Sequence, residues 1–178
     1  LVESRATEEG KNILTLLKSS IKDKKLEQKI IVELAHAEFD INNFEFAEDN
    51  CKILLNDQEG SLEDQGRVLN LLSLIEFQVK GKLKTALEFS LEALKKYKHI
   101  QLPRRVAGMH VNIGTFFDIQ GNKIEAESHW QKALNINSAI GNLEQEASIR
   151  LNYGVFHHHN NNFEKAIESW QQARTIFS

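Results

Sequence analysis

Two asparagines stand in closely similar settings, as V-N-I-G at residues 111–114 and as L-N-Y-G at residues 151–154. A carboxamide side chain offers an acceptor oxygen and two donor hydrogens, so Asn112 and Asn152 can pair with the N–H and C=O groups of another chain whatever its sequence. The alternative is that each asparagine bonds a neighbouring helix or faces solvent. The chemistry that these residues indicate is hydrogen-bonded recognition.

The histidines do not form a pattern typical of a metal site. His157, His158 and His159 are consecutive, so on a helix their side chains point about 100° apart and do not converge on one ion. No H-x3-H pair places two imidazoles on one helix face, and His110 and His129 belong to different predicted helices. We expect no metal and no cofactor, and we expect histidines near a helix end to be solvated or to cap it.

Catalytic motifs are missing from the sequence, which has no G-x-S-x-G, no phosphate-binding glycine loop and no C-x2-C. The only cysteine, Cys51, lies four residues after an alanine, as do Ser90, Trp130 and Trp170 in the copies of a repeat described below. This position predicts a small buried packing residue. It has no second cysteine to pair with, which suits a reducing compartment. We therefore expect no enzyme activity and a cytoplasmic location.

Charge and hydropathy exclude two further classes of partner. The net charge is −3, with acidic and basic residues interspersed, so we expect neither a nucleic-acid nor an anionic-membrane surface. No run of eighteen apolar residues is present, so we expect a soluble protein without a spanning helix. The chain starts at Leu1 rather than at a methionine, and we expect it to be part of a longer polypeptide.

The chain is built from repeats. The pattern of residues 117–133 returns at residues 157–173, and both copies contain a small residue, a tryptophan and a second small residue at spacings of four and three. Such spacing places all three on one helix face. The leading alanines of four copies are Ala47, Ala86, Ala126 and Ala166, at intervals of 39, 40 and 40 residues.

Turn and cap residues divide each copy into two helices. Gly121 and Asn161 lie five residues before the leading alanine of their copies, and Gly114 and Gly154 lie twelve before it, which predicts a helix pair with a tight turn. The predicted organisation is one array, with a leading helix of a truncated repeat at 1–22 and repeats at 23–60, 61–101, 102–141 and 142–178. The predicted caps are Asp23, Ser61 with Asp64, Asn122 with Glu125, and Asn142 with Gln145.

This pattern resembles the tetratricopeptide repeat, in which a small residue in the first helix is followed by small-x3-large in the second. The period is longer than the usual one of about 34 residues, the first-helix tryptophan is replaced by Ile31, Asn70, His110 and Arg150, and no proline closes a repeat. HEAT and armadillo repeats are the alternative, and the second-helix pattern decides against them. The resemblance implies an all-α, right-handed superhelical solenoid of antiparallel helix pairs, about nine helices in all.

The resemblance also implies that the first helix of each pair lines a concave groove that binds partners. Residues spaced i, i+4, i+7 and i+11 share that face. They predict a partner site that comprises Lys29, His36, Val68, Leu72, Ile75, Val79, Asn112, Thr115, Asn152 and His159. Two asparagines on adjacent repeats would then clamp an extended segment, as in the long-period class found in bacterial signalling proteins, kinesin light chains and polarity adaptors.

The aliphatic stripe of the second repeat, Val68 to Val79, has two interpretations. Facing the groove, it is an exposed apolar patch that marks a partner site. Alternatively the helix is rolled so that the stripe is core and Arg67, Asn70 and Ser73 define its wet side. Full burial of Leu72 and Ile75 would exclude the first interpretation.

The predicted function is protein–protein recognition without catalysis, with a peptide or a partner helix held in the groove, as the sensor or adaptor part of a larger, bacterial signalling protein. The carboxylate clamp of chaperone-binding tetratricopeptide domains is not matched, since too few cations stand at the corresponding positions. The alternative function is a spacer or scaffold that self-associates weakly through its uncapped ends.

Overall fold

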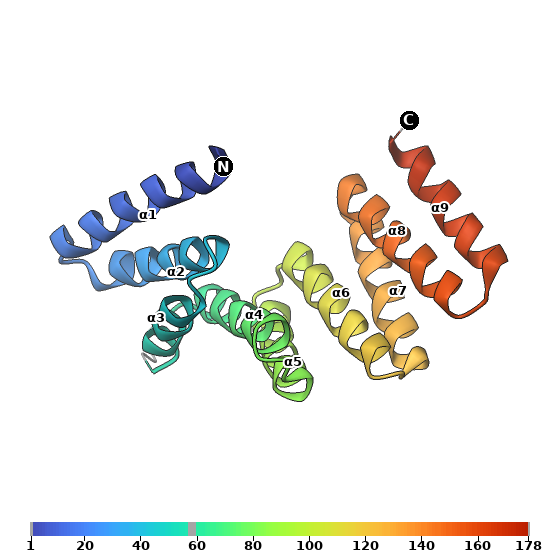
Figure 1. Cartoon of the computed structure of the whole chain (residues 1–178), viewed down its shortest axis with the longest axis horizontal. Helices are drawn as coiled ribbons and strands as arrows, with labels where there is room; N and C mark the ends of the chain where they lie inside the picture. The colour runs from blue at the N-terminus through green and yellow to red at the C-terminus, as the bar shows by residue number, and fades with distance from the viewer. Residues whose placement is uncertain (1, 57–59, 178) are drawn as a thin grey trace. The chain divides into compact units, whose positions relative to one another are not determined.

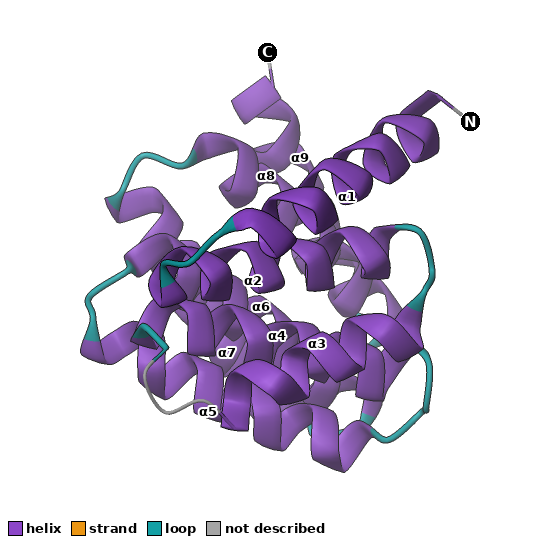
Figure 2. Cartoon of the chain, turned by 90° about the vertical axis from the view of Figure 1, so that its left-hand side faces the viewer, coloured by secondary structure: helices purple, strands orange, loops and turns teal. Residues whose placement is uncertain are grey.

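The computed structural model describes residues 2–56 and 60–177, and the side chains of 8–56 and 60–176; in this part of the chain all regular structure is α-helical (Figures 1 and 2). Residues 57–59, in the predicted link between the first two repeats, lie outside it. The helices are α1 (Val2–Ser20), α2 (Lys24–Asp40), α3 (Phe44–Asn56), α4 (Leu62–Gln78), α5 (Leu83–His99), α6 (Pro103–Ile119), α7 (Lys123–Ala139), α8 (Leu143–His159) and α9 (Phe163–Phe177). Each predicted repeat contains one helix pair.

Three of the four predicted side-chain caps form, those of Asp23, Ser61 and Asn122 at the starts of α2, α4 and α7. Asp23 accepts hydrogen bonds from the backbone N–H groups of Lys25 and Leu26 at 2.9 and 3.2 Å. Ser61 accepts from the N–H of Asp64 at 3.1 Å. The prediction for Asn142 is wrong, because its side chain makes no cap bond and instead donates from Nδ2 to Oδ1 of Asn137 at 2.9 Å.

The tight turns use residues that tolerate a left-handed backbone. Gly121 has a φ of +79°, and Asn161, at the same place in the next repeat, has a φ of +58°. Glycine meets no steric penalty in this region and asparagine is among the few other residues that visit it. The equivalence predicted between these two positions is therefore realised in the backbone.

The chain divides into two compact units, residues 1–96 and 97–178, with the boundary in the last turn of α5. In the first unit, α1 packs on α2, α2 on α3, and α3 on α4. Cys51 is fully buried in the core of this unit, as predicted, and burial raises the pKa of its thiol to about 12. It is therefore a packing residue and not a reactive thiolate.

The aliphatic stripe of α4 is core, and its prediction as a partner site is wrong. Val68, Leu72 and Ile75 are only 1%, 4% and 1% exposed, and they pack against α2 and α3. The helix is apolar over most of its circumference, so burial covers several faces at once. Val79, at 44% exposure, is the one stripe residue at the surface.

The predicted wet side of α4 is also partly wrong. Ser73 is fully buried, and its hydroxyl bonds the carbonyl of Ala86 and the hydroxyl of Ser90 at 2.8 and 2.7 Å. These two bonds satisfy a polar group that would otherwise be costly to bury. They join α4 to α5 within the first unit.

In the second unit, α6 packs on α7, α7 on α8, and α8 on α9 (Figure 1). Trp130 lies against Gly114, where an added Cβ would come within 2.7 Å of the indole, and its N–H donates to the carbonyl of Val111 at 3.3 Å. Trp170 lies against Gly154 in the same way and donates to Leu151 at 3.2 Å. The glycine and tryptophan of each repeat therefore interlock its two helices.

Candidate functional site

One face of α6 remains open in the second unit. Six residues at helical spacing share it, and each is exposed or half-buried: Arg104, Gly108, Val111, Asn112, Thr115 and Ile119. The Thr115 hydroxyl donates to the carbonyl of Val111 at 3.1 Å within the same helix. Asn112, which is half-buried, therefore lies at the middle of an accessible strip.

The matching face of α8 is more exposed. It carries Glu144, Ser148, Leu151, Asn152, Val155 and His159, all of them exposed. Leu151 and Val155 are both 44% exposed. Leu151 directly precedes Asn152, and Val155 lies about one turn after it. We call these two strips together the α6–α8 face. It holds four of the predicted site residues, which are Asn112, Thr115, Asn152 and His159.

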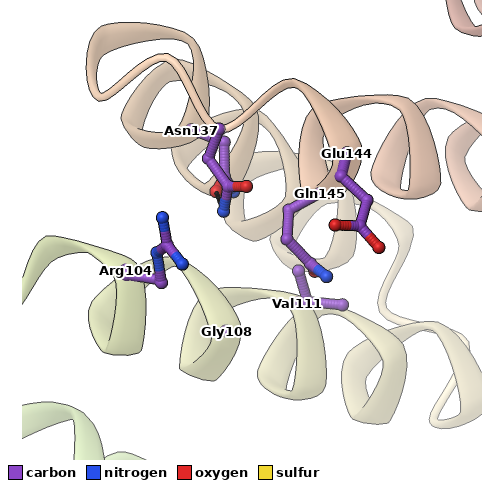
Figure 3. A pocket seen from close by; sticks show the side chains of 7 residues that line it. Arg104, Gly108, Val111, Asn137, Glu144 and Gln145 are labelled. Atoms are coloured by element: carbon purple, nitrogen blue, oxygen red, sulfur yellow. Dashed lines mark hydrogen bonds between the residues drawn. The ribbon is translucent and has the colours of Figure 1, made fainter. Parts of the chain in front are cut away.

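A hollow of about 210 Å³ opens between the N-terminal parts of α6 and α8. Its walls are formed by Arg104, Gly108, Val111, Asn137, Asn142, Glu144 and Gln145. Figure 3 shows Arg104 on one wall and Asn137 on the other, directed toward each other. Several of these residues belong to the α6–α8 face, so the hollow is continuous with the asparagine strip.

The remaining predicted residues lie in the first unit. On α2, Lys29 is exposed and His36 is half-buried. Glu33, between them, binds the guanidinium of Arg67 through both carboxylate oxygens at 2.7 and 3.0 Å. This strip of α2 is charged and partly occupied by an ion pair to α4, which distinguishes it from the amide strip of the second unit.

Sequence reasoning missed a buried histidine pair. His110 on α6 and His129 on α7 are 4% and 9% exposed, and their Nδ1 atoms lie 3.0 Å apart. Burial lowers the pKa of both rings, that of His110 to about 4. Two neutral imidazoles share one hydrogen bond here. The two residues lie 19 positions apart, and only the helix pairing within the repeat brings them together.

The histidine run was only partly predicted. His158 and His159 are exposed, as expected, whereas His157 is 3% exposed and its ring lies 4.4 Å from that of Tyr153. Burial lowers its pKa. His157 occupies the repeat position of Phe117, and that correspondence was the available signal for its burial.

Within the described residues, His, Cys, Asp and Glu side chains form no group of three or more that would hold a metal ion. The same part of the chain contains no helix with the length and hydropathy needed to cross a membrane.

Several solved structures are similar to this chain. BtubC (BKLC) from P. vanneervenii matches with a TM-score of 0.80 at 20% identity, over 98% of this chain and 73% of that one. A Signal Transduction ATPase with Numerous Domains (STAND) protein from Pyrococcus horikoshii, which has a tetratricopeptide repeat sensor, matches with a TM-score of 0.82 at 21% identity over 99% of this chain. This chain has the tetratricopeptide-repeat (TPR) fold.

MamA is a further neighbour, with a TM-score of 0.68 at 12% identity over 96% of this chain and 88% of that one. No protein-family model and no curated protein matches the sequence. The present chain matches only 28% of the length of the STAND protein. At these identities the likeness establishes the TPR fold, and the partner has to be inferred from the chain's own residues.

Proposed function

We propose that this TPR array is a non-catalytic protein-interaction module that binds an extended segment of a protein partner along the α6–α8 face. The observation that carries the proposal is the placement of Asn112 and Asn152 at equivalent points of two strips that remain accessible in one compact unit. Each amide can donate to a main-chain carbonyl and accept from a main-chain N–H. The pair would fix the register of the segment without reading its sequence.

The surroundings of the asparagines support this role. Leu151 and Val155 offer exposed apolar area beside Asn152, and Ile119 offers more at the end of α6. Apolar contact supplies affinity, whereas main-chain hydrogen bonds supply alignment. Lys29 and His36 on α2 belong to a separate, charged strip, which we assign no part in this contact.

We also propose that the chain is the sensor or adaptor portion of a longer signalling protein in the cytoplasm. The STAND protein supports this proposal, because it has a tetratricopeptide repeat sensor and the present chain covers 28% of its length. Coupling to a neighbouring catalytic module would then pass through occupancy of the α6–α8 face.

The test uses peptides selected on the intact chain from a random display library, with affinities measured by fluorescence anisotropy. Asn112→Ala combined with Asn152→Ala is expected to weaken binding by about 1–3 kcal/mol if both amides hold main-chain groups. Asn135→Ala is the matched control, because Asn135 is an exposed amide on α7 outside the α6–α8 face. Equal affinities for the double variant and the control would remove the asparagines from the site.

A second function, self-association, is favoured by apolar residues at the ends of the array. On α1, Ile13 and Leu16 are 58% and 68% exposed, and on α9, Phe163 and Ile167 are 53% and 52% exposed. Surfaces of this kind mark contacts with other proteins or further copies. Light scattering over a wide concentration range tests it. A constant monomer mass would refute it, and a mass that rises with concentration and falls in Leu16→Lys would support it.

A further inference from the structure

The hollow beside Arg104 is lined by one cationic side chain and by amide side chains that donate hydrogen bonds. Arg104 is exposed on α6, and in the part of the chain that the structure describes it makes no ion pair. An arginine presents several N–H donors in a fork that matches a carboxylate. Its guanidinium is directed into the hollow (Figure 3).

A second donor comes from the opposite wall. Asn137 is only 2% exposed, its Nδ2 donates to the carbonyl of Ala133 at 2.9 Å, and its Oδ1 accepts from Asn142 at 2.9 Å. A carboxamide nitrogen carries two hydrogens. Within the described residues the second hydrogen of Asn137 has no acceptor, and the amide lines the hollow.

Gly108 keeps the space between these donors open. It lies one turn after Arg104, and an added Cβ at this position would meet no atom within 4 Å. Any longer side chain here would project into the hollow, since Gly108 is part of its lining.

We infer that this hollow receives the carboxylate of an Asp or Glu side chain from the bound segment, so that the partner of the α6–α8 face is an acidic peptide segment. The inference rests on the proposed function and adds the chemical class of the partner. Glu144 is also in the lining. Its negative charge offsets the positive charge of Arg104, and the other lining residues are uncharged. The second charge of a phosphate therefore gains no net attraction here, while it adds to the cost of desolvation. A phosphopeptide is therefore the rejected alternative.

The experiment takes peptides selected on the wild-type chain and replaces each acidic residue in turn by its amide, Asp by Asn or Glu by Gln. One such replacement is expected to weaken binding by about 10-fold or more, the effect of losing a charge-assisted hydrogen bond. In the Arg104→Gln variant, the same replacement should change affinity less than about 2-fold, because the cation that recognises the carboxylate is gone.

Two variants control the interpretation. Arg105→Gln removes the neighbouring exposed cation, which does not line the hollow, and it should retain the full effect of the acid-to-amide change. Gly108→Gln fills the hollow and should abolish that effect while leaving Arg104 in place. A phosphoserine at the selected position should bind more weakly than Glu.

The outcomes separate this inference from the proposed function. If Asn112→Ala with Asn152→Ala weakens binding but Arg104→Gln leaves the acid-to-amide effect intact, the carboxylate site is refuted and the peptide site stands. If neither the double asparagine variant nor Arg104→Gln changes peptide binding, the α6–α8 face is refuted as the binding site. Tighter binding of the phosphoserine peptide than of its Glu counterpart would overturn the choice of a carboxylate.

Discussion

Two glycines of the same helix should respond in opposite ways to the same substitution. Gly114→Ala places a Cβ 2.7 Å from Cδ1 and 2.8 Å from Nε1 of Trp130, and 3.2 Å from the carbonyl oxygen of Ala126. Ordinary contacts between such atoms lie at about 3.5–4.0 Å. The indole must therefore retreat by roughly 1 Å, away from a position where it is 4% exposed and packs edge-on against Phe156 with ring centroids 4.8 Å apart.

The net effect follows from three contributions. Overpacking a closed core costs about 1–3 kcal/mol. Loss of the indole hydrogen bond to Val111 costs about 1 kcal/mol more, and the better helix propensity of alanine returns about 1 kcal/mol. We expect Gly114→Ala to lower the free energy of unfolding by about 1–3 kcal/mol. Gly108→Ala meets no atom within 4 Å and should raise it by about 0.5–1 kcal/mol.

Urea unfolding followed by tryptophan fluorescence is the suitable assay. Both tryptophans, Trp130 and Trp170, lie in the unit of residues 97–178, so the signal reports the unit that carries both substitutions. Midpoint and slope give the free energy of unfolding by linear extrapolation. A Gly114→Ala variant as stable as the wild type would refute the interlocking of glycine and indole. Destabilisation by Gly108→Ala would show that the helix-propensity argument does not apply to α6.

Three further predictions concern buried side chains. As pH falls from 7 to 5, His110 becomes protonated in the unfolded chain but not in the folded chain, where its pKa is about 4. We therefore expect the free energy of unfolding to fall by about 1–2 kcal/mol, allowing for solvent screening. Urea titrations at both pH values measure this loss, which should be smaller in His110→Asn. The charges of Lys98, Lys132 and Glu125 also act on the histidine pair. The loss of stability is nearly absent at pH 7, above the unfolded pKa of about 6.5, and grows as the pH falls below it. Leu72→Ala should cost about 2–5 kcal/mol by calorimetry or denaturant, because its side chain is core; a cost below about 0.5 kcal/mol would contradict its burial. Cys51→Ser should cost about 1–3 kcal/mol by the same measurement, since the hydroxyl enters an apolar cluster; an unchanged stability would mean that it finds a partner.

The repeat pattern made the helix pairs predictable because it combines two independent periodicities. The spacing of Ala126, Trp130 and Ala133 identifies one helix face, and the 40-residue interval to Ala166 identifies the unit that recurs. Full burial of Ala126, Ala133 and Ala166, at 0%, 0% and 1% exposure, confirms that this face is core. The strips of α6 and α8 came from another source, the resemblance to the tetratricopeptide repeat, which implies that the first helix of each pair lines a groove.

The stripe of α4 escaped the same logic. Which face of a helix is buried follows from periodicity only when the other faces are polar, and α4 presents Leu69 and Leu71 beside Val68 and Leu72. Its roll is then set by neighbours, and the cluster formed with α2 and α3 decides it. Position in the repeat therefore predicts the exposed face of a helix only where the residue types leave one face polar, and α4 does not meet this condition.

The histidine pair shows the complementary limit. In TPR arrays the two helices of a repeat pack along their length, so residues 19 apart can meet. The same separation joins the Trp130 indole to Val111 and the Trp170 indole to Leu151, and it joins His110 to His129. The separation was therefore available from the tryptophan copies, and applying it to the polar residues of α6 and α7 would have predicted the contact. Sequence spacing does not predict the burial that keeps both rings neutral. That burial depends on the side chains packed around the pair, such as Phe117, whose ring centroid lies 5.6 Å from that of His129.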